Sequence, residues 1–524
     1  MTTTTTNNND ATTKDAAPPP PPPPHVVIVG GGLAGLMAAR QLLRDDDTVR
    51  VTLVEAQDRL GGRLQADTSL VPGYPLDMGA EFIHCVDTTL TRVISEYKLA
   101  PQVDWEAYFV TAHADGGPDD EPTRDGKYGM YYCDGQLLMY DHASLHPLSE
   151  ALEDLIVRGA DETVVDLNAS IADAMQQYDL PPSLRRLAVA GYGNTAGSTD
   201  MHKLSWRVLT RFERYWEEHE TDGDFRLPAQ LGMTSVVRAL QSDLEQYQPR
   251  FDLRVNWPVS TIDQDVFQEE GNEEESMAVS PVLVHAVNQQ EGTLPADAVI
   301  CTVPPPLLPQ ILPNLLTAEQ RETLQYVGFE TVTKVMLKFN TRPWPAHLQS
   351  VICADGGPLP EIWFRNDLVA VADEPQKEDK DGSSSSRQTF HIMVAYLASG
   401  LADDFLKTLQ TKATEQQTNT KQVATDLCLA QLAKVLSLEL QELQNMHMDT
   451  LVHAWNAETE PYTPGGYMYP KPGLVTLAPL AAPCRGGRVV LAGEATNTSA
   501  CCTMQAAMDT GVRAAKQVQN LLKL

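Results

Sequence analysis

Short apolar runs and segments with helical spacing alternate along the chain. An apolar run at 26–29 leads through a glycine-rich turn into a helical pattern, and a second apolar run follows at 49–54. Further along, KVMLKFN (334–340) and TFHIMVAYLASG (389–400) alternate as strands do when one face is buried. The pattern predicts an α/β chain with a strand–helix–strand unit near its start and a mixed sheet in its second half.

The glycine-rich turn has the spacing Gly30-x-Gly32-x-x-Gly35, and Glu55 ends the next apolar run. In a dinucleotide-binding unit, such glycines permit a tight turn, a close approach to a pyrophosphate and close helix–strand packing. An acid about 20 residues further on accepts hydrogen bonds from the ribose diol. The alternative is a structural glycine turn, but the flanking strand, the helix and the acid all favour dinucleotide binding.

A second glycine turn follows in Glu55-x-x-x-Arg59-x-Gly61-Gly62-Arg63 and suits a longer, bulkier dinucleotide. The whole run resembles the FAD fingerprint of the flavin amine oxidases, a family of monoamine oxidases, polyamine oxidases and lysine-specific histone demethylases. The resemblance extends from about residue 25 to 520. It implies a Rossmann-type FAD-binding domain of the GR2 type and a discontinuous α+β substrate domain built on a mixed sheet.

The domain boundaries follow from the same comparison of patterns. We expect a disordered Thr/Asn/Pro-rich tail at 1–24, because such a composition cannot build a core. The predicted FAD-binding domain comprises 25–100, 225–308 and 446–524. The predicted substrate-binding domain, with a helical subdomain, comprises 101–224 and 309–445.

Composition narrows the possible partners. The net charge of −31 over 524 residues argues against nucleic acid, which requires clustered Lys and Arg. An acidic field attracts cations such as polyamines, although it also serves simply to solvate the surface. The eight cysteines lack regular spacing and indicate reduced thiols, with Cys501 and Cys502 as packing residues rather than a redox pair. We assign no metal site and leave the oligomeric state open.

The sequence contains neither a signal-peptide pattern nor an apolar stretch of the ~20 residues that span a bilayer. We therefore expect no membrane association and a cytoplasmic location. The ending Leu522-Lys523-Leu524 resembles a peroxisomal address but lacks its small first residue, so a peroxisomal location has weak support.

Lys334 is the first candidate catalytic residue. A strand lysine is ordinarily solvent-facing, but the resemblance places Lys334 where the family has a lysine that holds a water against the flavin N5. Burial would lower the pKa of such a lysine, so a near-neutral amine bonded to water is expected.

Further residues match positions of the family that contact FAD. Glu494, in VVLAGEA, is expected at the sugar-like chain or pyrophosphate, with a helix-capping or surface acid as the alternative. Thr503 and Met504 open the last helical pattern and would direct N–H groups at the flavin pyrimidine. The remaining expected FAD contacts are Gln57, Arg63, Gly79, Ala80, Glu81, Phe82, Val259 and Trp455, together with Gly30, Gly32, Gly35 and Glu55.

Tyr467 matches one wall of the family's aromatic cage in front of the flavin, and Trp455 matches a flavin-side aromatic. Thr503 stands where monoamine oxidases have a tyrosine as the second wall. Gly466 stands where they have their flavin-linking cysteine, so FAD is expected to be non-covalent. Both departures favour the polyamine oxidase and demethylase branch.

His84 matches a histidine that lines the substrate site of animal-type polyamine oxidases, although Cys85 replaces the following glycine. It is expected either to bind a substrate nitrogen or to be a structural histidine. Glu81 could offer its carboxylate to a cationic substrate. Tyr192, Trp363 and Arg365 are coarser candidates for the pocket lining.

The sequence therefore predicts an FAD-dependent amine oxidase closest to polyamine oxidases, with a small amine and O2 as substrates and H2O2, an aldehyde and a shorter amine as products. One alternative is an L-amino-acid oxidase, which needs an arginine for the substrate carboxylate, or another primary-amine oxidase. A histone demethylase is less favoured because no coiled-coil insertion is evident. The other alternative is a catalytically silent flavoprotein that acts as an interaction module.

Overall fold

The structure is a computed structural model of the chain. It describes residues 22–84, 87–99, 109–110, 128–159, 161, 166–219, 224–228, 230–264, 280–288, 290, 292–365, 389–499 and 501–524. The predicted tail at 1–24 therefore lies almost entirely outside the described residues. Cys85 also lies outside them.

The first layer is a parallel sheet of five strands in the order β10-β2-β1-β14-β22. These strands are β1 (His25–Val29), β2 (Arg50–Val54), β10 (Phe251–Arg254), β14 (Ala298–Cys301) and β22 (Val489–Leu491). They come from three separated parts of the chain, and all five are parallel to their neighbours. The predicted strand–helix–strand unit and the α/β fold class are confirmed.

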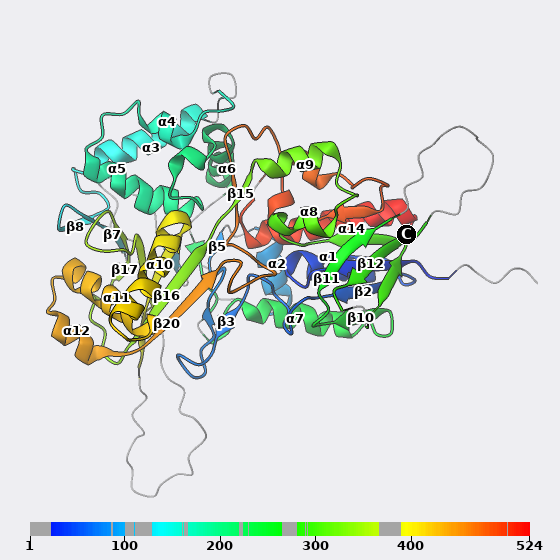
Figure 1. Cartoon of the computed structure of the whole chain (residues 1–524), viewed down its shortest axis with the longest axis horizontal. Helices are drawn as coiled ribbons and strands as arrows, with labels where there is room; N and C mark the ends of the chain where they lie inside the picture. The colour runs from blue at the N-terminus through cyan, green and yellow to red at the C-terminus, as the bar shows by residue number, and fades with distance from the viewer. Residues whose placement is uncertain are drawn as a thin grey trace, which may run out of the picture.

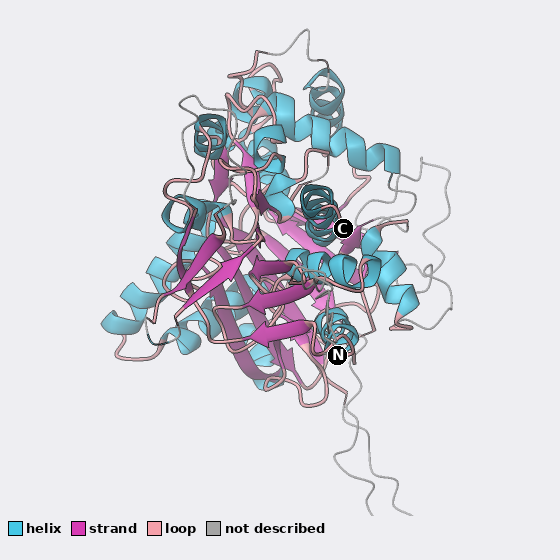
Figure 2. Cartoon of the chain, turned by 90° about the vertical axis from the view of Figure 1, so that its right-hand side faces the viewer, coloured by secondary structure: helices cyan, strands magenta, loops and turns pink. Residues whose placement is uncertain are grey.

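Each face of this sheet is covered by a different layer (Figures 1 and 2). Alternate side chains such as Val26 and Ile28 pack against α1 (Leu33–Asp45), α7 (Thr234–Glu245) and α14 (Met504–Leu522). Val27 and Val29 face the other way, toward an antiparallel sheet of β11 (Val259–Asp263), β12 (Val282–Ala286) and β13 (Thr293–Ala296). Burial on both faces is why these parallel strands read as continuous apolar runs.

The second large layer is a seven-stranded mixed sheet in the order β20-β16-β19-β18-β17-β7-β8. Its strands are β7 (Tyr128–Cys133), β8 (Gln136–Met139), β16 (Val332–Phe339), β17 (Leu348–Cys353), β18 (Glu361–Arg365), β19 (His391–Ala398) and β20 (His447–Trp455). One face, with Val335, Leu337 and Phe339, packs on α10 (Ser399–Glu415), α11 (Thr420–Leu436) and α12 (Leu440–Met446). The other face is directed toward the candidate site.

The edge strand β20 lies within the segment 446–524, which we assigned to the FAD-binding domain, but it pairs with β16 over most of its length. The mixed sheet therefore extends past the predicted boundary at residue 446. A sequence pattern cannot place such a boundary, because pairing partners far apart in the chain decide it.

A helical cluster caps the upper left of the view in Figure 1. It consists of α3 (His146–Gly159), α4 (Ile171–Met175), α5 (Pro182–Ala188), the π-helix η2 (Val189–Gly193), the 3-10 helix η3 (Met201–Lys203) and α6 (Trp206–His219). The remaining elements are α2 (Thr89–Glu96), α8 (Leu308–Ile311), α9 (Ala318–Gln325), α13 (Ala478–Ala481), η5 (Pro305–Leu307) and η6 (Glu494–Thr496), with the short strands β3 (Ala66–Asp67), β4 (Leu76–Asp77), β5 (Ile83–His84), β6 (Phe109–Val110), β9 (Asp224–Phe225), β15 (Val327–Phe329) and β21 (Met468–Pro470).

Candidate functional site

The first glycine turn has open space at the start of α1. No described atom lies within 4 Å of the place where a Cβ on Gly32 would stand. Gly32 is the N-cap of α1 without a side-chain cap, and the first turn of that helix contains no acidic residue. A Cβ on Gly35, in contrast, would stand 2.0 Å from Gly30 O, so helix and strand approach closely there. Unpaired N–H groups beside open space are what a phosphate needs.

Glu55 lies beside this turn at the end of β2 and is 7% exposed. Its Oε2 accepts from the Gly31 N–H at 2.7 Å, and its Oε1 accepts from the Gln57 N–H at 2.9 Å. Burial raises the pKa of Glu55, and these hydrogen bonds oppose the shift. The Gln57 side chain is directed elsewhere, since its Nε2 donates to Glu460 at 2.9 Å. Val259 begins β11 two residues after Trp257, whose N–H donates to Glu55 O.

The second glycine turn packs on the first. Gly61 donates to Gly31 O at 2.9 Å, and the only described atom within 4 Å of a Cβ on Gly62 would be Gly32 Cα at 3.6 Å. Arg63 extends from this turn and forms an ion pair with Glu494, with 2.9 Å between Nη1 and Oε1. The same Nη1 donates to Gly466 O at 2.8 Å. The turn that carries Arg63 thus meets the segment that carries Glu494, although the two residues are 431 positions apart in the chain.

Glu494 also contacts the start of the last helix. It is 4% exposed, and its Oε2 accepts from the Cys502 N–H at 3.1 Å. Thr503 is the N-cap of α14, where its hydroxyl accepts from Ala506 N–H, and Met504 is the first helical residue. The capping alternative for Glu494 does not describe these contacts, because Thr503 is the residue that caps α14.

These segments together fit a dinucleotide cofactor. Gly32 and Gly62 leave space where side chains would project, α1 begins without a side-chain cap, and Arg63 directly follows the second turn. A Cβ on Gly79 would meet Arg63 O at 1.7 Å, and Ala80 N–H donates to Arg63 O at 3.3 Å, so the 79–82 segment lies against the second turn.

Lys334, on β16, is 7% exposed and reaches the 77–81 segment. Its Nζ donates to Asp77 O at 3.0 Å, to Gly79 O at 2.8 Å and to Glu81 Oε2 at 3.1 Å. The fold thus brings a carboxylate that is 253 positions away in the sequence into contact with this lysine.

Glu81 is surrounded by three cations. Arg226 Nε lies 2.8 Å and Arg365 Nη1 3.3 Å from its Oε1, in addition to Lys334. Burial alone would raise the pKa of Glu81, but Arg226, Lys334 and Arg365 together hold the pKa of this carboxyl well below its usual range. Glu81 is therefore ionised at neutral pH and stabilises a cluster of positive charge. Arg226 was not among the predicted site residues.

A row of polar side chains crosses the mixed sheet on the face of Lys334. Lys334 is opposite His453 of β20 and opposite Tyr396 of β19, and Tyr396 in turn is opposite Glu361 of β18. Directly opposed residues of antiparallel strands share a face. The sequence reasoning missed His453, Tyr396 and Glu361, because strand period alone gives a face for each strand but not the register between strands.

Glu361 is 6% exposed, and both its oxygens accept hydrogen bonds from neutral donors. Asn194 Nδ2 donates to Oε2 at 3.0 Å, and Trp363 Nε1 donates to Oε1. Burial raises the pKa of Glu361 to about 7, although both hydrogen bonds and the charge of Lys334 oppose the shift. Near neutral pH this carboxyl therefore exists in both protonation states.

Tyr467 contacts this row of side chains at Tyr396. Its hydroxyl lies 2.8 Å from the Tyr396 hydroxyl and donates to Thr195 O at 2.6 Å. Trp455 is 2% exposed and donates from Nε1 to Met78 O at 3.0 Å, so it packs against the 77–81 segment.

The structure places the other predicted residues less centrally. The centroids of the Phe82 and Trp363 rings lie 4.9 Å apart. His84 is half-buried on β5, and its carbonyl accepts from Gln505 Nε2 at 3.4 Å. The Tyr192 hydroxyl, in η2, is buried and has no hydrogen-bond partner among the described residues.

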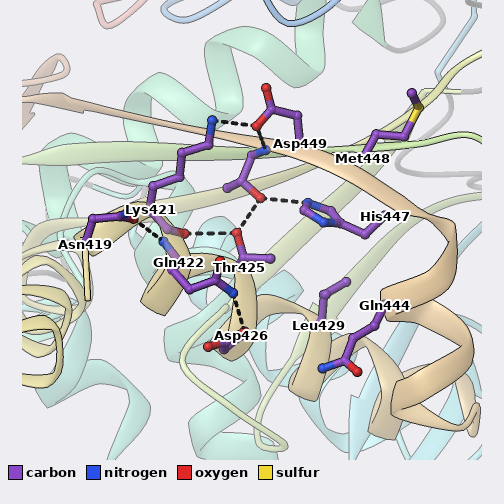
Figure 3. A pocket seen from close by; sticks show the side chains of 11 residues that line it. Asn419, Lys421, Gln422, Thr425, Asp426, Leu429, Gln444, His447, Met448 and Asp449 are labelled. Carbon is purple, nitrogen blue, oxygen red and sulfur yellow. Dashed lines mark hydrogen bonds and ion pairs between the residues drawn. The ribbon is translucent and has the colours of Figure 1, made fainter. Parts of the chain in front are cut away.

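A separate surface groove lies between α11 and β20 and has a volume of about 500 Å³ (Figure 3). Lys421 and Asp449 form an ion pair in it, and Thr450 Oγ1 bonds to Thr425 and His447. Its polar groups thus bond to one another, and none of the predicted site residues lines it. We place the candidate site at the Lys334 row instead, because buried charges converge there.

Comparison with known proteins agrees with this geometry. Residues 33–519 match the family of flavin containing amine oxidoreductases, and the chain belongs to that family. The predicted resemblance to the flavin amine oxidases is thereby confirmed. Among the described residues, no helix is both long and apolar enough to cross a membrane.

Individual relatives are distant. Human lysine-specific histone demethylase 2 is 25% identical over 509 residues, covering 93% of this chain but 52% of that protein. The chain therefore spans about half the length of that relative. Human peroxisomal N(1)-acetyl-spermine/spermidine oxidase is 25% identical over 526 residues, covering 93% of both chains. The structure of wild-type putrescine oxidase bound to putrescine has a TM-score of 0.67 at 19% identity, covering 96% of this chain and 99% of the other. The structural likeness supports the fold.

Proposed function

We propose that the chain is an FAD-dependent oxidase of amines that carry a second cationic nitrogen, such as polyamines, with O2 as electron acceptor. The observation that carries this proposal is the position of Glu361. It lies on the same sheet face as Lys334, two strands away, which at the usual strand spacing is about 10 Å. A buried carboxylate at that separation suits an ammonium a few methylenes from the reacting amine.

The cofactor would lie along the two glycine turns. Gly32 would approach its pyrophosphate, with Gly30 and Gly35 shaping the turn. Glu55 would approach its ribose, and Arg63, Glu494 and Thr503 the flavin half. Bound flavin would supply the hydride acceptor for the carbon beside the amine nitrogen and would transfer the electrons to O2. Gly466 has no thiol to which the flavin could be linked, so non-covalent binding of FAD is part of the proposal.

The chain's own residues would orient the substrate and exclude water. Lys334 would hold a water at the reacting end by giving up one of its three present contacts, and Glu81 would keep its side chain in place. Tyr467 and Tyr396 would border the path of the amine between the two ends. Ionised Glu361 would bind the distal ammonium and thereby set the distance that the substrate spans. His84, near the start of α14, would meet the substrate only at the rim of the site.

The alternative of an L-amino-acid oxidase gains one observation. Arg226 and Arg365 are the arginines that a substrate carboxylate would need, and both lie beside Lys334. Glu81 already supplies a carboxylate to both, however, so a second one would have to compete with a buried ion pair. The polyamine proposal is therefore the better supported.

The decisive experiment is anaerobic reduction of the flavin in the purified protein by spermine, spermidine, N-acetylated polyamines, monoamines and L-amino acids. Reduction by polyamines, with a Glu361→Gln variant that loses affinity for them but not for monoamines, supports the proposal. The exposed Glu442→Gln substitution, on α12, is the matched control. Reduction by amino acids alone would transfer the assignment to that alternative, and no reduction at all would favour the silent flavoprotein.

A further inference from the structure

Two adjacent thiols lie immediately before α14. Cys501 and Cys502 have their Sγ atoms 2.9 Å apart. Cys501 is 1% exposed, whereas Cys502 is half-buried. The sequence alone favoured a packing role for this pair, because adjacent cysteines need not direct their side chains at each other. In the fold they do.

Cys502 also contacts the candidate flavin site. Its backbone has φ +71°, its N–H donates to Glu494 Oε2 at 3.1 Å, and its thiol donates to Met468 O at 2.8 Å. Met468 directly follows Tyr467, and Glu494 pairs with Arg63. The pair thus joins two segments that border the site.

We propose that Cys501 and Cys502 form a redox modification site, in which a hydroperoxide converts the two thiols into a disulfide between neighbouring residues. The proposal rests on the proposed function only for the source of oxidant, since O2-dependent amine oxidation releases H2O2 beside the pair. The overall change is two thiols and one H2O2 to one disulfide and two waters.

The steps follow ordinary thiol chemistry. The sulfur of Cys502, the residue with the larger exposed fraction, attacks one peroxide oxygen, the O–O bond breaks, and a sulfenic acid and water form. The sulfur of Cys501 then attacks the sulfenic sulfur, the S–O bond breaks, and the second water leaves. Because only thiolates attack well and burial raises the pKa of both thiols, the oxidation should be slow at neutral pH and accelerate as the pH rises.

The oxidised pair would lose the hydrogen bond from Cys502 to Met468 O, because a disulfide has no S–H to donate. The segment that carries Tyr467 would then lose one of its attachments. We therefore expect oxidation to lower turnover severalfold and reduction with dithiothreitol to restore it.

The test treats the FAD-loaded protein with H2O2 alone, then denatures it in an alkylating agent and measures peptide masses. The expected result is joint loss of alkylation at both cysteines with a mass lower by about 2 Da, reversible by dithiothreitol. Cys428, a lone buried cysteine on α11, is the internal control and should remain alkylated. Added peroxide needs no amine turnover, so failure here is distinguishable from failure of the proposed function.

Two results would overturn the proposal. One is full alkylation of both cysteines at peroxide doses that oxidise exposed methionines. The other is accumulation of sulfinic acid on Cys502 without a disulfide, which would mean that Cys501 does not react. A Cys501→Ser variant supplies the reference for that second pattern, because it removes the resolving thiol.

Discussion

Lys334 Nζ lies 3.1 Å from Glu81 Oε2, and both side chains are buried. The pair joins the mixed sheet to the segment that follows the second glycine turn, so it connects the two halves of the candidate site. Removing a buried partner costs more than the pair itself contributes, because an uncompensated charge remains.

Lys334→Met should slow flavin reduction or reoxidation by about 100-fold, the order expected for loss of a positioned polar group, while FAD stays bound. Stopped-flow absorbance of the flavin measures both half-reactions. Lys338→Met is the matched control, since Lys338 is a buried lysine on the same strand face whose Nζ contacts Leu70 O instead. Normal turnover of the Lys334 variant would remove Lys334 from the mechanism.

Glu81→Gln should destabilise the protein by about 3–5 kcal/mol, because Lys334, Arg226 and Arg365 would be left without their shared counter-charge. Urea denaturation monitored by far-UV circular dichroism measures this loss. The folded pKa of Glu81 lies below its usual value of 4.5, so its contribution is present above pH 4.5 and is lost as the pH falls below it. A variant as stable as the parent at pH 7 would contradict the ion-pair assignment.

Two glycine substitutions should separate folding from cofactor binding. Gly32 has φ −73° and open space at its Cβ, so Gly32→Ala should fold normally but retain less FAD. Gly35→Ala would place its Cβ 2.0 Å from Gly30 O and should lower the melting temperature. Thermal unfolding and the 450 nm flavin absorbance after gel filtration report the two effects. Equal FAD content in Gly32→Ala and the parent would argue against the phosphate position.

Polyamine affinity should depend on the protonation of Glu361. Its pKa of about 7 in the free protein means that protonation below that pH removes the charge that binds a distal ammonium. The KM for a polyamine should therefore rise as the pH falls below about 7, whereas the KM for a monoamine should not show this limb. In Glu361→Gln the limb should be absent, and its persistence would assign the titration to another group.

Arg63 and Glu494 should act together in holding the cofactor. Glu494→Gln keeps the shape of the side chain but removes the charge that pairs with Arg63, so FAD should dissociate more readily. Fluorescence of FAD released on dilution measures this, and Glu442→Gln, at an exposed glutamate on α12, is the comparison. A Glu494 variant that retains FAD as the parent does would limit this residue to a structural role.

Much of the first layer was determined by the sequence itself. The glycine spacing, the apolar runs before and after it, and Glu55 depend on local backbone geometry, which neighbouring residues specify. The family resemblance then extended that prediction to Lys334, Glu494 and Thr503. The residue pattern of those segments did not by itself single out these positions.

The tertiary structure alone decided which polar and charged side chains meet. Glu81 contacts Arg226 and Arg365, and Glu361 accepts a hydrogen bond from Asn194. The members of each of these pairs lie far apart in the chain. Their contact depends on the register between strands and on how two sheets and a π-helix pack, and hydrophobic period carries no information on either. The sequence thus indicated which segments we expect to bind a dinucleotide, whereas only folding specified the electrostatic environment in which an amine would react.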